Sequence, residues 1–186
     1  MEHVGFTIWF TGVPAAGKST IGHAVEQRLR ELGLLVENLD SDEVRAIISP
    51  KLGWSLEARD ENTKRLAYMG HILSRNRIAV IIAAVASLRR FRDRAREMIP
   101  NFVEVYVKCP LEVCMARDPK GLYARAARGE INDVAGLHQP YEEPLAPELI
   151  LETNRHTVDE CVEQVLATLA ELEYVPAARL GKAAAS

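Results

Sequence analysis

The chain has 186 residues, of which 48% are apolar and 26% charged, and its net charge is −3 at pH 7. This is the composition of one globular domain with its own core, and a weakly acidic chain argues against binding nucleic acid through bulk electrostatics. No apolar run approaches the roughly 20 residues that span a bilayer, so we expect neither a nucleic-acid nor a membrane partner. Cys109, Cys114 and Cys161 lack metal-ligand spacing, which indicates reduced thiols and a cytoplasmic location.

Strands and helices are predicted to alternate along the chain. In chain order we expect a strand over 6–11, a glycine loop over 12–19, a helix over 18–32, a strand over 34–39, a helix over 42–48 capped by Ser41, a helix over 56–76, a strand over 78–85, an arginine-rich helix, a strand over 102–107, a helix from 111, a short strand at Ile150 and a helix over 158–172. This alternation predicts a three-layer α/β/α sandwich around a mainly parallel five-stranded sheet.

The segment 118–147 interrupts this alternation and is rich in glycine and proline. A loop of that length inside a compact domain is usually functional, so we expect a mobile lid. We assign residues 1–174 to a single domain. Residues 175–186 are alanine-rich without a periodic pattern, and we expect them to form a disordered tail.

A phosphate-binding motif follows the first predicted strand and opens the first predicted helix. The residues Gly12, Val13, Pro14, Ala15, Ala16, Gly17, Lys18 and Ser19 fit G-x-x-x-x-G-K-[ST] at every fixed position. In such a loop the backbone N–H groups and the helix N-terminus surround phosphate oxygens, Lys18 reaches the β- and γ-phosphates, and Ser19 ligates Mg²⁺. The sequence therefore predicts a P-loop NTPase-like fold that binds ATP and Mg²⁺.

The rest of the chain favours a kinase of a small molecule over a GTPase. The guanine-recognition pattern N-K-x-D is absent, and the D-x-x-G match at residues 133–136 lies in the lid, where a switch would not sit. A kinase must exclude water from ATP, and the predicted lid suits that need.

Two aspartates end the second predicted strand, at the edge of the sheet where ligands bind. Asp40 and Asp42 suit two tasks, holding magnesium-bound water and accepting the proton of the attacking hydroxyl. Arg45 shares a helical face with Asp42. Helix capping by Ser41 and Asp42 is the structural alternative, and it is compatible with catalysis.

Four further residues are candidates for the acceptor side. Arg59 and Asn62 share one helix face and suit a bound anion, although such a pair is more often a solvated surface. Trp54 either stacks on a base or fills the core. Lys120, at the entry to the lid, could neutralise charge on the transferring phosphoryl group. The arginines over 89–96 alternate with acidic residues, and we expect most of them to form a solvated surface.

At this point the chain resembles the adenylylsulfate kinases, from about Phe6 to the last helix. The motifs that carry the resemblance are the P-loop over 12–20, Leu39-Asp40-x-Asp42-x-Val44-Arg45, Leu52-Gly53-Trp54-Ser55 with Arg59 and Asn62, Arg117-Asp118-Pro119-Lys120-Gly121-Leu122-Tyr123, and Pro140-Tyr141-Glu142-x-Pro144. The resemblance implies an ATP- and Mg²⁺-dependent enzyme of sulfate assimilation that phosphorylates the 3′-hydroxyl of adenosine 5′-phosphosulfate. It also implies a homodimer and a functional link to ATP sulfurylase.

The resemblance assigns roles on the ATP side. The P-loop with Thr20 would hold the phosphates, Ser19 and Asp40 the metal, and Arg117 would lie near the adenine of ATP. Ser87 matches a serine described in the family as a phosphorylated intermediate, which direct in-line transfer does not need.

On the acceptor side, the resemblance makes Asp42 the implied base, with Lys120 as the lid lysine; both would contact the substrate. The residues that would bind adenylylsulfate are Arg45, Arg59, Asn62 and Trp54, the last where the family usually has a phenylalanine stacked on the substrate adenine.

Four departures from the family pattern affect mainly the acceptor side. Where the family has Asp-Gly-Asp, this chain has Ser41 in place of the glycine, and where the family has Ser-Pro-Tyr-Arg, residues 87–90 read Ser-Leu-Arg-Arg. The lid sequence Gly-Phe-Thr-Gly of the family is replaced by Asp-Val-Ala-Gly at residues 133–136. The Asp-Asp that precedes Pro-Tyr-Glu in the family is replaced by His-Gln at residues 138–139. The lid change removes the second aromatic expected to stack on the substrate adenine. Two alternatives therefore stay open: a kinase of the same fold with another nucleotide-like acceptor, and a nucleotide-binding regulatory protein without catalysis.

Overall fold

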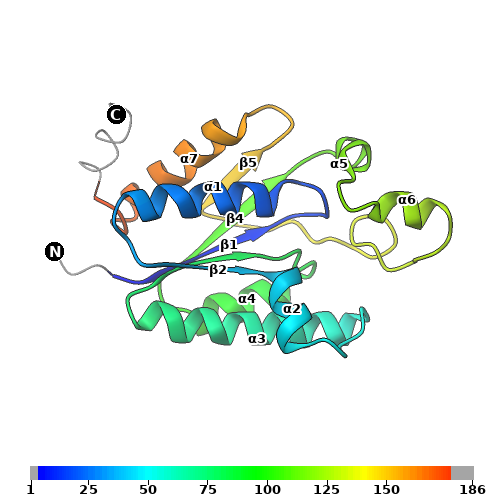
Figure 1. Cartoon of the computed structure of the whole chain (residues 1–186), viewed down its shortest axis with the longest axis horizontal. Helices are drawn as coiled ribbons and strands as arrows, with labels where there is room; N and C mark the ends of the chain where they lie inside the picture. The colour runs from blue at the N-terminus through cyan, green and yellow to red at the C-terminus, as the bar shows by residue number, and fades with distance from the viewer. Residues whose placement is uncertain (1–3, 177–186) are drawn as a thin grey trace.

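The computed structural model describes residues 4–176, which form a parallel β-sheet covered by helices on both faces (Figure 1). The sheet has five strands in the order β2-β3-β1-β4-β5, and all neighbouring strands pair in parallel. The strands are β1 (Phe6–Thr11), β2 (Val36–Asp40), β3 (Ala79–Ala83), β4 (Phe102–Lys108) and β5 (Leu149–Glu152). The predicted three-layer α/β/α class is confirmed.

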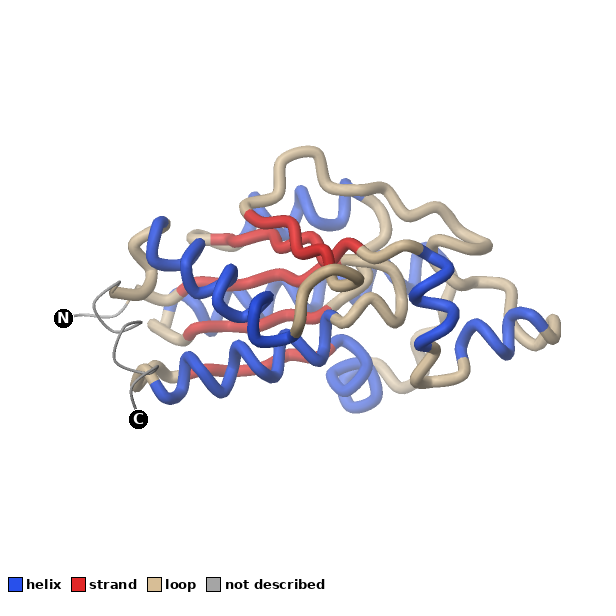
Figure 2. The backbone as a smooth tube through the Cα atoms, turned by 90° about the horizontal axis from the view of Figure 1, so that it is seen from above, coloured by secondary structure: helices blue, strands red, loops and turns tan. Residues whose placement is uncertain are grey.

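The helices are divided between the two faces and the carboxyl edge of the sheet. Helices α1 (Lys18–Glu31) and α7 (Val158–Glu171) pack together on one face, and α3 (Leu56–Arg75) and α4 (Arg89–Met98) on the other (Figures 1 and 2). The shorter helices α2 (Ser41–Ile48), α5 (Leu111–Arg117) and α6 (Leu122–Ala127) lie beyond the carboxyl ends of the strands. Ligand-binding loops of parallel sheets gather at this edge. No helix within residues 4–176 is long and apolar enough to cross a membrane.

Every residue of β1 is buried, because this strand is central and covered on both faces. Its alternating side chains enter two separate cores: Phe6, Ile8 and Phe10 join the core beneath α1 and α7. Trp9 points the other way and joins the core beneath α3 and α4. A rigid central strand therefore leads directly into the glycine loop at residue 12.

Several predicted boundaries differ from the structure. The second strand runs from 36 to 40 and the third from 79 to 83, since a strand extends only as far as its neighbour pairs with it. The predicted cap of α2 is wrong: Asp40, not Ser41, is the N-cap, and its side chain accepts a hydrogen bond from the N–H of Asp42 at 2.9 Å.

The lid, predicted as a loop, contains regular secondary structure, and the predicted tail begins with a residue that is packed in the core. The lid includes α6 and a bridge between Ala135 and Gln139. Val175 is only 1% exposed and belongs to the core beneath α7, so packing continues past the predicted boundary at residue 174. Residues 177–186 of the predicted tail lie outside the described residues, and the division into domain and tail stays a prediction.

Candidate active site

The glycine loop between β1 and α1 has a conformation that requires glycine at two positions. A Cβ atom on Gly12 would lie 2.4 Å from the carbonyl oxygen of Val107, closer than real Cβ contacts come. Gly17, the N-cap of α1, has a φ of 108°, which L-residues rarely adopt. The loop therefore turns tightly, and the N-terminus of α1 opens toward the carboxyl edge of the sheet.

Lys18 lies folded over this loop. Its Nζ donates hydrogen bonds to the carbonyl oxygens of Gly12, at 3.0 Å, and Val13, at 2.8 Å. Burial lowers the pKa of Lys18 to about 8, and the nearby carboxylate of Asp42 opposes that shift. A buried ammonium group held only by carbonyl oxygens is suited to receive an anion such as a phosphate.

Ser19 and Asp40 bring two hard oxygen ligands together. The Ser19 hydroxyl donates to Oδ2 of Asp40 at 2.6 Å, while Oδ1 of Asp40 caps α2. Within residues 4–176 no group of three or more His, Cys, Asp or Glu side chains is arranged to hold a metal. One hydroxyl and one carboxylate fit Mg²⁺, which usually completes its octahedron with phosphate oxygens and water rather than with a full set of protein ligands.

Asp42 and Lys120 meet across the mouth of the site, one from α2 and the other from the lid. Nζ of Lys120 lies 2.5 Å from Oδ2 of Asp42, and both side chains are more than half exposed. The hydrogen bond that Lys120 donates to Asp42 raises the pKa of Lys120. The predicted base and the predicted lid lysine are therefore in direct contact.

Trp54 lies between two arginines rather than in the core. It is 53% exposed, and the guanidinium carbons of Arg45 and Arg59 lie 4.1 and 5.7 Å from its ring centroid. Arg45 also donates to the carbonyl oxygens of Leu52, at 3.0 Å, and Gly53. Burial lowers the pKa of both arginines. The interpretation of Trp54 as a core side chain is thus wrong, and an aromatic face flanked by two cations suits a planar anionic ligand.

Asn62 and Ser87 are buried at the same end of the site. Asn62 donates to the hydroxyl of Ser41 at 3.1 Å, and it is not on a solvated helix surface. Its Oδ1 and the Ser87 hydroxyl have no hydrogen-bond partner within the described part of the chain. Buried polar atoms without partners are costly, so both groups are suited to contact a ligand.

One cavity of about 1250 Å³ connects most of these residues. Its walls include the following predicted site residues: Pro14, Ala15, Gly17, Lys18, Ser19, Thr20, Asp40, Asp42, Arg45, Trp54, Arg59, Asn62, Ser87, Arg117 and Lys120. Three predicted P-loop residues are not in this wall: Gly12 and Ala16 lie behind it, and Val13 faces a neighbouring cavity of about 640 Å³.

Thr153 lies in the cavity wall just after β5, although it was not among the predicted site residues. Its hydroxyl donates to the carbonyl oxygen of Ala16 at 2.8 Å, and Arg117 donates to its carbonyl oxygen at 2.7 Å. His156, for which no role was predicted, lines the same cavity. Their position after the carboxyl end of a parallel strand was the available signal.

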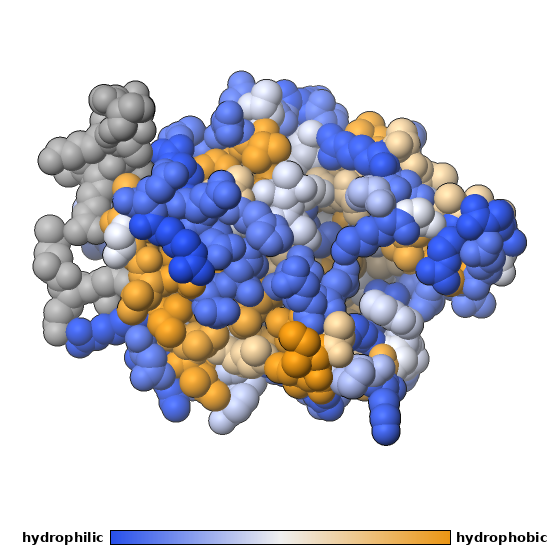
Figure 3. All heavy atoms as spheres, viewed as in Figure 1, coloured by the Kyte–Doolittle hydropathy of each residue, from blue (hydrophilic) through white to orange (hydrophobic). Residues whose placement is uncertain are grey.

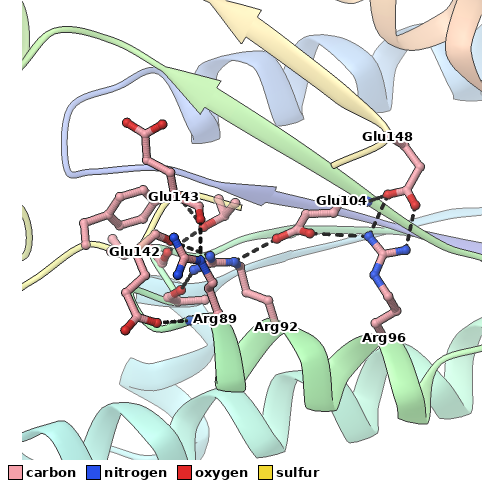
Figure 4. A network of polar contacts seen from close by, with 11 residues as sticks. Arg89, Arg92, Arg96, Glu104, Glu142, Glu143 and Glu148 are labelled. Atoms are coloured by element: carbon pink, nitrogen blue, oxygen red, sulfur yellow. Dashed lines mark hydrogen bonds and ion pairs between the residues drawn. The ribbon is translucent and has the colours of Figure 1, made fainter. Parts of the chain in front are cut away.

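Most of the arginines over 89–96 were expected on a solvated surface, and Arg92 does not lie there. This side chain is 1% exposed, and its Nε donates to Glu104 of β4 at 2.8 Å (Figure 4). It also donates to the carbonyl oxygens of Ala86 and of Glu142, the latter at 2.5 Å. Arg92 thus joins the loop before α4 to the segment 140–148, which we call the strap.

The strap is also fixed to the base of the P-loop. The Tyr141 hydroxyl lies 3.0 Å from Oγ1 of Thr11, the last residue of β1. A Glu142 carboxylate oxygen accepts the N–H of Arg89 at 2.8 Å, and the Glu142 N–H donates to the carbonyl oxygen of Ser87 at 2.8 Å (Figure 4). The strap therefore holds the end of the lid against two loops that form the cavity.

A P-loop whose lysine is held by carbonyl oxygens, paired aspartates facing it and a lid across one cavity define a kinase that transfers phosphate to a small molecule. Residues 4–152 match the family described as adenylylsulphate kinase. The chain belongs to this family.

Relatives of full length support the same assignment. An adenylyl-sulfate kinase of Picosynechococcus is 45% identical over 175 residues, which cover 94% of this chain and 99% of the relative. The structure of the Mycobacterium tuberculosis APS kinase CysC in complex with AMPPNP and APS has a TM-score of 0.86 at 37% identity, over 90% of this chain and 98% of that one.

Two longer relatives contain a similar domain. A probable bifunctional SAT/APS kinase of Sorangium cellulosum is 42% identical over 92% of this chain, which spans 30% of that protein. A hexameric APS kinase from Thiobacillus denitrificans is 32% identical with a TM-score of 0.72, over 94% of this chain and 30% of the other.

Proposed function

We propose that this protein transfers the γ-phosphoryl group of ATP to the 3′-hydroxyl of adenosine 5′-phosphosulfate, giving 3′-phosphoadenosine 5′-phosphosulfate. The observation that supports this most strongly is the position of Asp42 and Lys120, which pair at 2.5 Å in the wall of the cavity that also contains Lys18. A proton acceptor, a mobile cation and a phosphate-binding lysine in one cavity are what this transfer needs.

On the donor side, the P-loop and Thr20 would hold the ATP phosphates, and Lys18 would move from its carbonyl partners to the β- and γ-oxygens. Ser19 and Asp40 would hold Mg²⁺, which supplies positive charge to those oxygens when bound. Arg117, anchored to Thr153, would lie against the adenine of ATP. These roles fit side chains that line one wall of the cavity.

On the acceptor side, Asp42 would accept the proton of the 3′-hydroxyl. Because its Oδ2 now accepts from Lys120, this step requires the lysine to leave the carboxylate and approach the transferring phosphoryl group. Arg45, Arg59 and Asn62 would bind the phosphosulfate end, and Trp54 would stack on the adenine. Ser87 would contact the acceptor, with direct in-line transfer and no phosphoserine.

A coupled assay of ADP release with adenylylsulfate tests the proposal. We expect no turnover in Lys18→Ala and a loss of about 10²- to 10⁴-fold in kcat in Asp42→Asn, the usual contribution of a general base. Glu43→Gln is the matched control, since it removes a neighbouring exposed carboxylate of α2. No turnover of adenylylsulfate by the unaltered protein, or an equal loss in the control, would contradict the proposal.

A second acceptor deserves testing because the lid lacks the family's phenylalanine. Val134 stands in its place and is 2% exposed, packed in the core, so Trp54 is the aromatic side chain in the cavity wall. A panel of other nucleotides, sulfated and cytidine-based ones included, in the same assay would identify another preferred acceptor. The intact set of Lys18, Asp42 and Lys120 argues against a regulatory protein without catalysis.

We also propose a cytoplasmic homodimer that works beside an ATP sulfurylase. Ile47 and Ile48 of α2 and Tyr68 of α3 are 80%, 46% and 59% exposed, and apolar atoms gather over this lower part of the molecule (Figure 3). Exposed apolar side chains on neighbouring elements favour an interface between protomers. The link to a sulfurylase is supported by the bifunctional SAT/APS kinase of Sorangium cellulosum. Light scattering after size exclusion measures the oligomeric state, and a monomer or a hexamer would contradict the dimer.

A further inference from the structure

The lid contacts Arg59, one of the two arginines beside Trp54, through Asp133. The resemblance of the chain to the family does not explain an aspartate at this position. Asp133 accepts a hydrogen bond from Arg59 through its carbonyl oxygen at 2.7 Å, and its carboxylate Oδ2 lies 3.8 Å from the same guanidinium nitrogen. Arg59 donates its Nε to the carbonyl oxygen of Trp54 at 3.0 Å. Its guanidinium is thus already engaged on both sides.

This ion pair is shielded from solvent more than most pairs of the molecule. The Arg59 side chain is 17% exposed and that of Asp133 31%, whereas Lys120 and Asp42 are 67% and 57% exposed. Solvent screens a shielded pair less, so the carboxylate lowers the positive potential at Arg59 effectively. An acceptor anion that approaches Arg59 must therefore replace Asp133 or share the guanidinium with it.

The charges of the whole cavity point the same way. Its acceptor end has three cations, Arg45, Arg59 and Lys120, and two of them are paired with carboxylates from the opposite side of the cavity mouth. Within the described part of the chain, Arg45 contacts carbonyl oxygens and the Trp54 ring rather than such a carboxylate. The lid is thus held closed by contacts that an anionic acceptor would have to break.

We propose that Asp133 sets the affinity for the acceptor by competing with its anionic group for Arg59. The carboxylate stands in for the phosphosulfate when the acceptor is absent and keeps the lid over the cavity. This inference rests on the proposed function, because it takes Arg59 as the anion-binding residue of the acceptor. The family pattern that the chain otherwise resembles has glycine at this position, so the resemblance does not account for the Asp133 carboxylate.

Asp133→Asn tests the inference, because it removes the charge and leaves the backbone hydrogen bond to Arg59. We expect the KM for adenylylsulfate to fall about two- to fivefold, the upper part of the range for a partly exposed ion pair, with kcat not raised and the KM for ATP unchanged. Glu130→Gln is the matched control: it removes another lid carboxylate, one that pairs with Arg125 and Arg128 instead. An unchanged or higher KM in Asp133→Asn, or an equal fall in the control, would overturn the inference.

A second measurement does not depend on turnover. Iodide should quench Trp54 but not Trp9, which is fully buried. Without the carboxylate of Asp133, Arg59 should attract iodide more strongly. The iodide quenching constant should therefore rise in Asp133→Asn and stay constant in Glu130→Gln, and neutral acrylamide should show no such change. No rise with iodide would overturn the inference. Absence of turnover in the unaltered protein would contradict the proposed function alone, and the iodide result would still decide whether Asp133 neutralises Arg59.

Discussion

Replacing Glu104 by glutamine removes one charge from a buried network and leaves the shape of the side chain. Glu104 lies 2.8 Å from Nε of Arg92 and 3.3 Å from Nη2 of Arg96, and its side chain is 9% exposed (Figure 4). Arg92 is 1% exposed, so its guanidinium would remain buried with only carbonyl oxygens and a neutral amide around it. We expect Glu104→Gln to lower the free energy of unfolding by about 3–5 kcal/mol, the range for breaking a buried pair on one side.

Urea denaturation followed by circular dichroism would measure this loss, and the melting temperature should fall by about 6–20 °C for a chain of this length. Glu163→Gln is the matched control, because Glu163 pairs with Arg28 at a similar 2.7 Å but is 58% exposed. We expect it to cost at most about 1 kcal/mol.

Removing both charges should be less harmful than removing one. The double variant Arg92→Met, Glu104→Met leaves no charge of the pair buried, so it should regain part of the stability lost in Glu104→Gln. The recovery is partial, because Arg92 also holds Ala86 and Glu142. A loss in Glu104→Gln no larger than in Glu163→Gln would refute the reasoning that burial makes this pair strong.

Three further predictions concern the P-loop and its surroundings. Burial lowers the pKa of Lys18 to about 8, and a bound triphosphate would raise it again, so ATP binding should be coupled to the uptake of a proton above pH 8. Calorimetry in buffers of different ionisation enthalpy should detect this uptake, and the substitution Lys18→Ala should abolish it. The substitution Gly136→Ala would place a Cβ 2.7 Å from Cγ1 of Val13. Gly129 has a similar positive φ but open space around it, so Gly129→Ala should lower the free energy of unfolding in urea by about 1–2 kcal/mol. Gly136→Ala should lower it by more. Ser87→Ala should retain kcat within about tenfold, since direct transfer needs no nucleophilic serine; a loss of several thousandfold would indicate a covalent step.

The phosphate-binding half of the site could be predicted from the sequence because it is local. Gly12, Gly17, Lys18 and Ser19 lie within one turn between a strand and a helix, and their spacing fixes the backbone geometry. The positions of Asp40 and Asp42 also followed from the order of elements, because the carboxyl ends of parallel strands share one edge. The predicted capping residue was wrong, since Asp40 and Ser41 are both suited to the N-cap and the end of β2 decides between them.

The rest depended on contacts between distant residues. Helical spacing places Arg92 on the same face as the buried Ala95, but the burial of its charge requires Glu104 from β4 and the carbonyl oxygen of Glu142 from the strap. The pairing of Arg59 with Asp133 joins residues 74 positions apart, and no local pattern indicates it.

Local spacing alone thus determined that this protein has a phosphate-binding loop on a parallel α/β sheet, with acidic residues nearby. The tertiary structure decided which arginines are buried, which carboxylate meets which cation, and how the lid closes over the cavity. The reason is that backbone turns and helix periods depend on neighbouring residues, whereas burial and charge pairing depend on segments that only folding brings together.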